Sequence, residues 1–189
     1  MTGIQRARQA FYDCSSANSM KDVAFIVNVE PVQEGLSKRL KEHANQIDWA
    51  RVVGYIDVSK RSNTSAGIVI CDTKAYFFGF PMKPRKIWYD EIEKAEVKKS
   101  KGECVGIRLR QRSGLDFTWE NDAIDSASLA ALFDALRQLR IEACDAYREA
   151  NLDARAAGTS FEEAGGFATS NKGTTNKIFD EERFHSRQG

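Results

Sequence analysis

Two apolar runs joined by a short polar turn constrain the fold of this chain more than any other feature. The sequence GIVICDTKAYFF, residues 67–78, places about five apolar residues on each side of Asp72, Thr73 and Lys74. Short runs rich in Ile, Val, Tyr and Phe are typical of β-strands, and a tight polar connection between two of them predicts a hairpin. This hairpin is expected to supply two strands of a larger sheet.

Further strand-like segments occur at regular spacing on both sides of this hairpin. The predicted strands cover residues 52–58, 66–71, 75–80, 87–89, 92–97, 104–109 and 115–119. Pro81 and Pro84 mark a loop, because proline cannot donate a hydrogen bond in a central strand. Strands of this length joined by short loops predict an antiparallel meander that closes into a barrel or sandwich.

A long helix is predicted directly after the last strand. Asp125 or Ser126 can cap its N-terminus, and Gly158 is a stop signal. Its apolar residues form one stripe: Leu129, Leu132, Phe133, Leu136, Leu139, Ala143 and Tyr147. We expect the stripe to be buried against one open end of the sheet, where Ile68, Ile70, Phe77 and Trp119 point inward.

The first 47 residues are predicted to be mostly helical. Ile4 and Phe11 have helical spacing, and a second helix is predicted after Pro31, where apolar residues recur every four positions: Val32, Leu36, Leu40 and Ala44. Between these helices, residues 23–29 are almost continuously apolar. Such a run fits a buried strand or the core turn of a helix, and periodicity does not decide between them.

Several short motifs occur in one order across the middle of the chain. They are Gly54-Tyr55-Ile56-Asp57, Gly67-Ile68-Val69-Ile70, Tyr76-Phe77-Phe78 and Ile87-Trp88-Tyr89-Asp90-Glu91-Ile92, closed by Trp119 and the helix from Ser126. Over roughly residues 50–145 this series resembles the bacterial pleckstrin-homology-like (PH-like) domains. The resemblance implies a strongly bent sheet of seven strands, plugged at one end by a C-terminal helix.

The predicted fold class is therefore α+β. It comprises a PH-like antiparallel bent sheet or barrel of about seven short strands, capped by a long C-terminal helix and preceded by an N-terminal helical segment. Three zones are expected: helical residues 1–47, a PH-like domain over 50–157, and a flexible linker and tail over 158–189, rich in Gly, Ser, Asn and Thr. The closing residues NKIFDEERFHSRQG resemble a junction after which a nuclease-like segment begins in some bacterial proteins.

Composition excludes several classes of protein. Twenty-eight Lys and Arg oppose 27 Asp and Glu, so the net charge of +1 does not select a partner. No apolar stretch approaches the roughly 20 residues of a membrane span, and the N-terminus lacks the apolar centre of a signal peptide. The sequence therefore predicts a cytoplasmic chain. The four cysteines form no metal-binding pattern, and Cys71 and Cys104 are expected to be buried free thiols.

Candidates for catalysis are few. The two histidines, His43 and His185, lie in a predicted helix and in the tail, far from any nucleophile in the sequence. Asp90, Glu96 and Lys98 imitate the carboxylates and lysine of metal-dependent nucleases. A solvated edge strand gives the same residues, and we favour that interpretation. We therefore predict no enzymatic activity, no metal and no cofactor.

Basic residues gather in the second half of the predicted sheet. Residues 83–112 contain ten Lys or Arg and five Asp or Glu. The candidate phosphate-binding residues are Lys98, Lys101, Arg108, Arg110 and Arg112. The three arginines alternate, so on a strand they share one face, which suits lipid headgroups or nucleic acid. We favour the alternative of a solvated face paired with Asp116 and Glu120.

Three functions follow from these patterns. The leading hypothesis is a non-catalytic interaction module that binds a protein or itself, through the N-terminal zone or an exposed sheet edge. The second is a phosphate-binding module for anionic lipid or nucleic acid. The third is the N-terminal part of an effector or defence nuclease whose catalytic part lies beyond Gly189.

Overall fold

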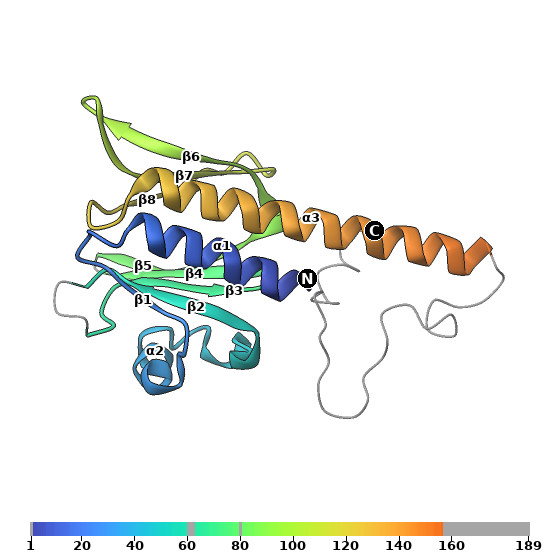
Figure 1. Cartoon of the computed structure of the whole chain (residues 1–189), viewed down its shortest axis with the longest axis horizontal. Helices are drawn as coiled ribbons and strands as arrows, with labels where there is room; N and C mark the ends of the chain where they lie inside the picture. Colours follow the sequence, from blue (N-terminus) through green and yellow to red (C-terminus); the bar gives the residue numbers. More distant parts are fainter. Residues whose placement is uncertain (1, 60–62, 80, 157–189) are drawn as a thin grey trace. The chain divides into compact units, whose positions relative to one another are not determined.

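A computed structural model describes residues 2–59, 63–79 and 81–156 of the chain (Figure 1). The chain divides into two compact units between Arg137 and Gln138. Helix α3 (Ser126–Ala156) crosses this boundary. The predicted linker and tail, 158–189, lie outside the described residues. No helix among the described residues is long and apolar enough to cross a membrane.

The first unit contains two antiparallel sheets. The elements before α3 are α1 (Gly3–Ala17), β1 (Ala24–Ile26), α2 (Gln33–Arg39), β2 (Val52–Asp57), β3 (Gly67–Cys71), β4 (Lys74–Gly79), β5 (Met82–Trp88), β6 (Ile92–Ser100), β7 (Glu103–Gln111) and β8 (Phe117–Glu120). One sheet has the order β1-β2-β3-β4-β5 and the other the order β6-β7-β8. This confirms the predicted α+β class and its meander, although the two sheets do not close into a barrel.

The hairpin of residues 67–78 forms as predicted. Strands β3 and β4 pair in antiparallel register, with Ile70 opposite Ala75 and Ile68 opposite Phe77. The turn between them is fixed from outside, because the Arg51 Nε donates to Asp72 Oδ2 at 2.8 Å and the Tyr89 N–H donates to the Thr73 carbonyl. The hairpin is therefore the centre of the five-stranded sheet, with a neighbouring strand on each side.

Aromatic rings fill the space between the two sheets and the first turns of α3. The Phe77 ring lies 4.7 Å from the Phe117 ring, 5.8 Å from Trp119 and 5.4 Å from Phe133, between centroids. Residues Leu132, Phe133 and Leu136 are all buried, as predicted. The Asp125 carboxylate accepts a hydrogen bond from the Ser128 N–H at 2.7 Å and so caps α3. Within residues 126–137 the stripe thus belongs to the core.

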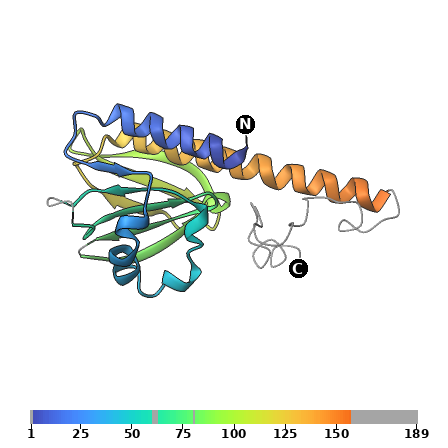
Figure 2. The same ribbon diagram turned by 60° about the horizontal axis from the view of Figure 1, so that its bottom comes forward.

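Helix α1 covers one face of the five-stranded sheet (Figure 2). Thr2 and Gln5 form a capping box at its start. Phe11 packs edge-on against Phe25 of β1, with ring centroids 5.4 Å apart. A Cβ at Gly54 would lie 2.6 Å from the Phe11 ring, so the glycine lets the helix approach the sheet.

Helix α2 and the segments around it cover the opposite face of the same sheet (Figure 2). Leu36, Leu40 and Ile47 form one buried cluster with tyrosines 55 and 76 of β2 and β4. The predicted helix from Val32 to Ala44 was too long, because α2 ends at Arg39. After Leu40 the chain turns across the sheet, which buries Ile47 as well. Both faces of β2, β3 and β4 are consequently buried.

The ambiguous run of residues 23–29 contains a short strand at the edge of the sheet. Residues Ala24, Phe25 and Ile26 form β1, which pairs with β2 opposite Asp57, Ile56 and Tyr55. The remaining residues of the run continue as irregular chain into the turn that precedes α2. The N-terminal zone therefore contributes a strand as well as helices.

Candidate functional site

Two of the three predicted phosphate-binding arginines, Arg108 and Arg110, lie on the outer face of the three-stranded sheet. The register places Glu96 opposite Arg108, and Lys94 opposite Arg110. The residues that alternate with these charged side chains are buried on the other face: Ala95 of β6 and Ile107 and Leu109 of β7. Alternation therefore separates a charged face from the core, as the sequence pattern indicated.

Carboxylates partner three of the five predicted basic residues. The Arg110 Nε lies 2.8 Å from Glu96 Oε2, and Lys94 Nζ lies 2.9 Å from Glu96 Oε1. A hydrogen bond from Lys94, assisted by the Arg110 charge, lowers the pKa of the Glu96 carboxyl below its ordinary value. Lys98 pairs with Glu120, and the Arg108 Nε is 4.0 Å from an oxygen of Asp116.

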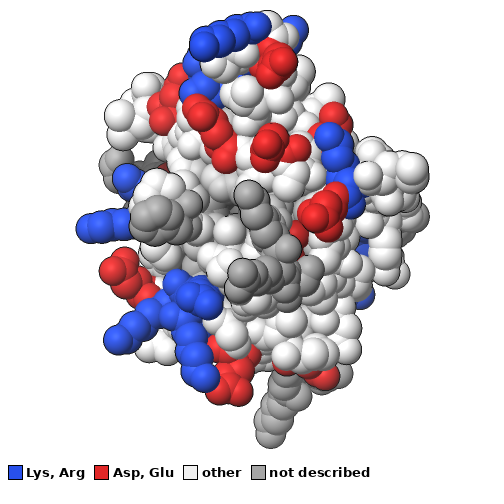
Figure 3. Space-filling model, turned by 90° about the vertical axis from the view of Figure 1, so that its left-hand side faces the viewer, with Lys and Arg blue, Asp and Glu red and all other residues white. Residues whose placement is uncertain are grey.

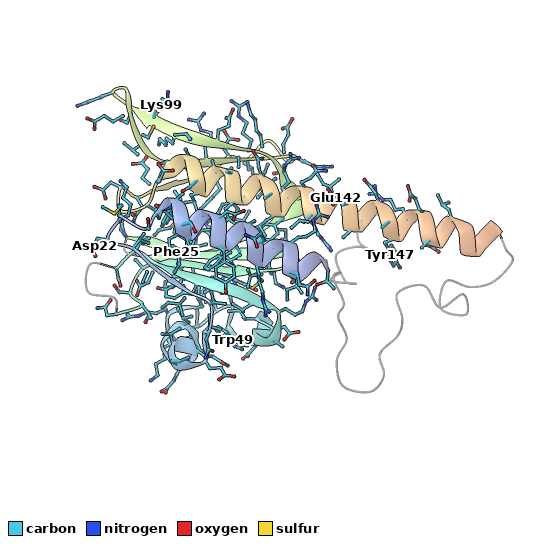
Figure 4. The ribbon with its side chains drawn as sticks, in the orientation of Figure 1. Asp22, Phe25, Trp49, Lys99, Glu142 and Tyr147 are labelled. Atoms are coloured by element: carbon cyan, nitrogen blue, oxygen red, sulfur yellow. The ribbon has the colours of Figure 1, made fainter. Side chains whose placement is uncertain are left out.

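The other two basic residues lie apart from this face. Lys101 is exposed in the turn between β6 and β7, next to Lys99 at the tip of the hairpin (Figure 4). Arg112 is exposed just past the other end of β7, where its N–H donates to the Glu91 carbonyl. The structure therefore does not gather all five residues into one site. On the face shown in Figure 3, Lys and Arg are interspersed with Asp and Glu.

A glycine lies between the paired residues Lys98 and Glu120 in the sheet. Gly106 of β7 lies between Lys98 on β6 and Glu120 on β8 in the register. A Cβ at Gly106 would meet the Trp119 carbonyl oxygen at 2.1 Å. The bare backbone at Gly106 therefore lets β8 pack closely against β7.

The three residues that imitate a nuclease motif, Asp90, Glu96 and Lys98, lie in two different structural elements. Asp90 lies in a short 3-10 turn (Tyr89–Glu91) between β5 and β6, whereas Glu96 and Lys98 lie on the charged face of β6. The Glu96 carboxylate already binds two cationic side chains. Among the described residues, no group of three or more His, Cys, Asp or Glu side chains is arranged to hold a metal ion.

Cys14 and Cys71 are buried, and His43 is half-buried. The His43 ring lies 5.5 Å from the Tyr76 ring, and His185 lies outside the described residues. Burial raises the pKa of the Cys14 thiol to about 11 and that of Cys71 to about 12, which suppresses the reactive thiolate. The prediction that Cys104 is buried was wrong, because β7 extends beyond the core and exposes its first residues.

A cavity of about 370 Å³ opens beside β8 in the first unit. Its apolar walls include Phe78, Met82 and Trp119, and the paired Lys98 and Glu120 line its polar side. The volume lies in the range of small-molecule sites. Nothing in its lining selects a particular class of ligand.

The four edge strands of the two sheets differ in a way that bears on binding. Strand β5 carries Lys83, Pro84, Arg85 and Lys86, so the prediction of a loop at Pro84 was wrong, because an edge strand accepts proline. Strand β6 carries alternating Lys and Glu, and β8 contains Glu120. Charged residues and proline are the usual means by which an edge strand avoids pairing with another chain. Strand β1 contains neither, since its residues are Ala24, Phe25 and Ile26.

The main chain of β1 presents hydrogen-bonding groups away from the sheet. The Val58 N–H donates to the Ala66 carbonyl, so alternate residues 56 and 58 direct their peptide groups towards β3. The intervening residues of β2, 55 and 57, direct theirs towards Ile26 and Ala24. The N–H and carbonyl of Phe25 therefore point outward from the last strand of the sheet.

Sequence reasoning named an exposed sheet edge but did not locate it. The signal was present in the run Val23-Ala24-Phe25-Ile26-Val27, which lacks charge and proline. Neither the strand nor its place at the edge is visible without the pairing to β2.

No protein-family model matches the chain, and no curated protein matches its sequence.

Proposed function

We propose that this chain is a non-catalytic interaction module that binds an extended protein segment along the outer edge of β1. One observation carries the proposal: β1 is an edge strand with neither charge nor proline in a sheet whose other edge has both. An added strand would satisfy the outward peptide groups of Phe25, the mode of recognition known as β-augmentation.

The surroundings of β1 support this assignment. Both faces of the neighbouring strand β2 are covered, one by α1 and the other by the buried cluster around α2. A partner would therefore bind this part of the sheet at its edge. Figure 4 shows Phe25 beside α1, and the Phe11 contact holds its ring in place. A strand held by helices on either face is ordered before binding, which reduces the entropy cost of association.

We further propose that residues 50–145 form a PH-like domain. The order of β2 to β5, then β6 to β8, then α3 supports the proposal, since it gives seven consecutive strands followed by a helix. Strand β1 is then an addition at one edge of that arrangement. We also propose a cytoplasmic location, because no stretch of the sequence is apolar over the roughly 20 residues of a membrane span.

A labelled peptide tests the proposed function. The probe is a fluorescent peptide of residues 20–30, MKDVAFIVNVE, which supplies an extended apolar segment. We expect the full chain to bind it, and Val27→Lys to weaken binding by about tenfold, since a charge beside an added strand is unfavourable. Leu115→Lys places the same charge at an exposed site outside the strands and is the matched control. Equal binding by all three proteins, or none by the unaltered chain, contradicts the proposal.

A further inference from the structure

We propose that the extended segment bound at β1 is the β1 of a second copy, which would join two five-stranded sheets into one sheet of ten strands. This inference rests on the proposed function, because it names the occupant of the same edge. It commits to a two-fold symmetric dimer with antiparallel β1 strands.

The sequence of the edge is close to self-complementary. In an antiparallel pair centred on Phe25, each residue faces the position that is equally far on the other side of Phe25. Val23 then faces Val27, and Ala24 faces Ile26. Residues 24–26 form the strand and Val23 and Val27 directly flank it, so the segment that would pair is apolar along its whole length.

The charges that flank the segment do not oppose this register. Lys21 and Asp22 lie before the strand, whereas the corresponding positions after it, Asn28 and Val29, are uncharged, and Val29 is buried. No like charges meet across the pair, whereas like charges directly opposite destabilise a sheet. Asp22 lies just before β1, which starts at Ala24 (Figure 4).

The direction of the peptide groups fits the same centre. The outward N–H and carbonyl of Phe25 would exchange two hydrogen bonds with those of Phe25 in the second copy, as a hydrogen-bonded antiparallel pair requires. The hydrogen bonds that join Ala24 and Ile26 to β2 are left intact. A two-fold axis normal to the sheet places both copies of α1 on the same face of the joined sheet.

Charge-pair variants test both the dimer and its register. Sedimentation equilibrium and light scattering on the full chain should show a concentration-dependent dimer. Val27→Lys and Val23→Glu should each raise the dimer Kd by about tenfold or more, because the symmetry places the altered pair in the interface twice. Leu115→Lys should leave the Kd unchanged, since Leu115 is 72% exposed and lies outside the strands.

Mixing the two edge variants identifies the register. A heterodimer of the Val27→Lys and Val23→Glu chains brings the new Lys opposite the new Glu, so the mixture should dimerise more tightly than either variant alone. A chain that stays monomeric at its highest soluble concentration yet binds the peptide of residues 20–30 overturns the self-pairing but not the proposed function. A monomer that also fails to bind the peptide overturns both. A dimer unaffected by the edge variants, or a mixture no tighter than its components, overturns the self-pairing.

Discussion

Phe133 provides the most direct test of how α3 stabilises the first unit. Its side chain is fully buried, stacks on Phe77 with centroids 5.4 Å apart, and meets the Tyr89 ring edge-on at 6.1 Å. Truncation of a buried Phe to Ala usually costs about 3–5 kcal/mol. Two aromatic contacts, each contributing about 0.5–1.5 kcal/mol beyond burial, place Phe133→Ala in the upper half of that range.

A graded series separates the two contributions. Phe133→Leu removes both ring contacts but keeps most of the buried volume, so we expect a smaller cost of about 1–2 kcal/mol. Leu115→Ala, at a side chain that is 72% exposed, should change the free energy of unfolding by less than about 0.5 kcal/mol.

Urea unfolding followed by far-ultraviolet circular dichroism measures these differences. The midpoint should fall in the order Leu115→Ala, Phe133→Leu, Phe133→Ala, with an unchanged dependence of stability on urea. All proteins are compared at one concentration, because association would shift each midpoint. If Phe133→Ala unfolds at the same urea concentration as Leu115→Ala, α3 does not stabilise the core in the way its ring contacts indicate.

Two further predictions concern ionisable groups. The folded-state pKa of Glu96 is lowered, so its pairing stabilises the fold above the ordinary pKa of 4.5 and this contribution is lost as the pH falls through the folded value. A carboxyl NMR titration should show Lys94→Ala returning the pKa towards 4.5 by more than Arg110→Ala does, since the Lys94 hydrogen bond is the larger cause; the reverse order would contradict this ranking. Iodoacetamide at pH 8 should label the exposed Cys104 in the native protein, whereas Cys71, with a pKa of about 12, should react only after unfolding, as checked by mass spectrometry. Rapid native labelling of Cys71 would show that its strand is open to solvent.

Features fixed by local pattern were predictable from the sequence. The hairpin of residues 67–78 combines two apolar runs with one short turn, and the start of α3 combines a cap at Asp125 with a wide apolar stripe. Each signal is complete within about twenty residues, so it needs no knowledge of the rest of the fold.

Features fixed by distant neighbours were not predictable. Phe25 lies in a strand only because β2 pairs with it, and Cys104 is exposed because β7 is longer than the core beneath it. Glu96 lies between two cations by virtue of the β6–β7 register, which brings Arg110 alongside. In each case the side chain's surroundings come from another segment of the chain, and the local pattern alone does not identify that segment.

The charged face and the β1 edge differ in how strongly each can contribute to binding. Arg110 and Lys98 already hold carboxylates, so an anionic ligand would have to displace Glu96 and Glu120, and exposed ion pairs of this kind are screened at physiological salt. The outward peptide groups of Phe25 face no such competition from within the sheet, since β1 is its last strand. A strand added there replaces water with a regular ladder and also shields the apolar side chains of Val23 and Val27. The main-chain pairing proposed at β1 would therefore not depend on the nearly balanced charge of this chain.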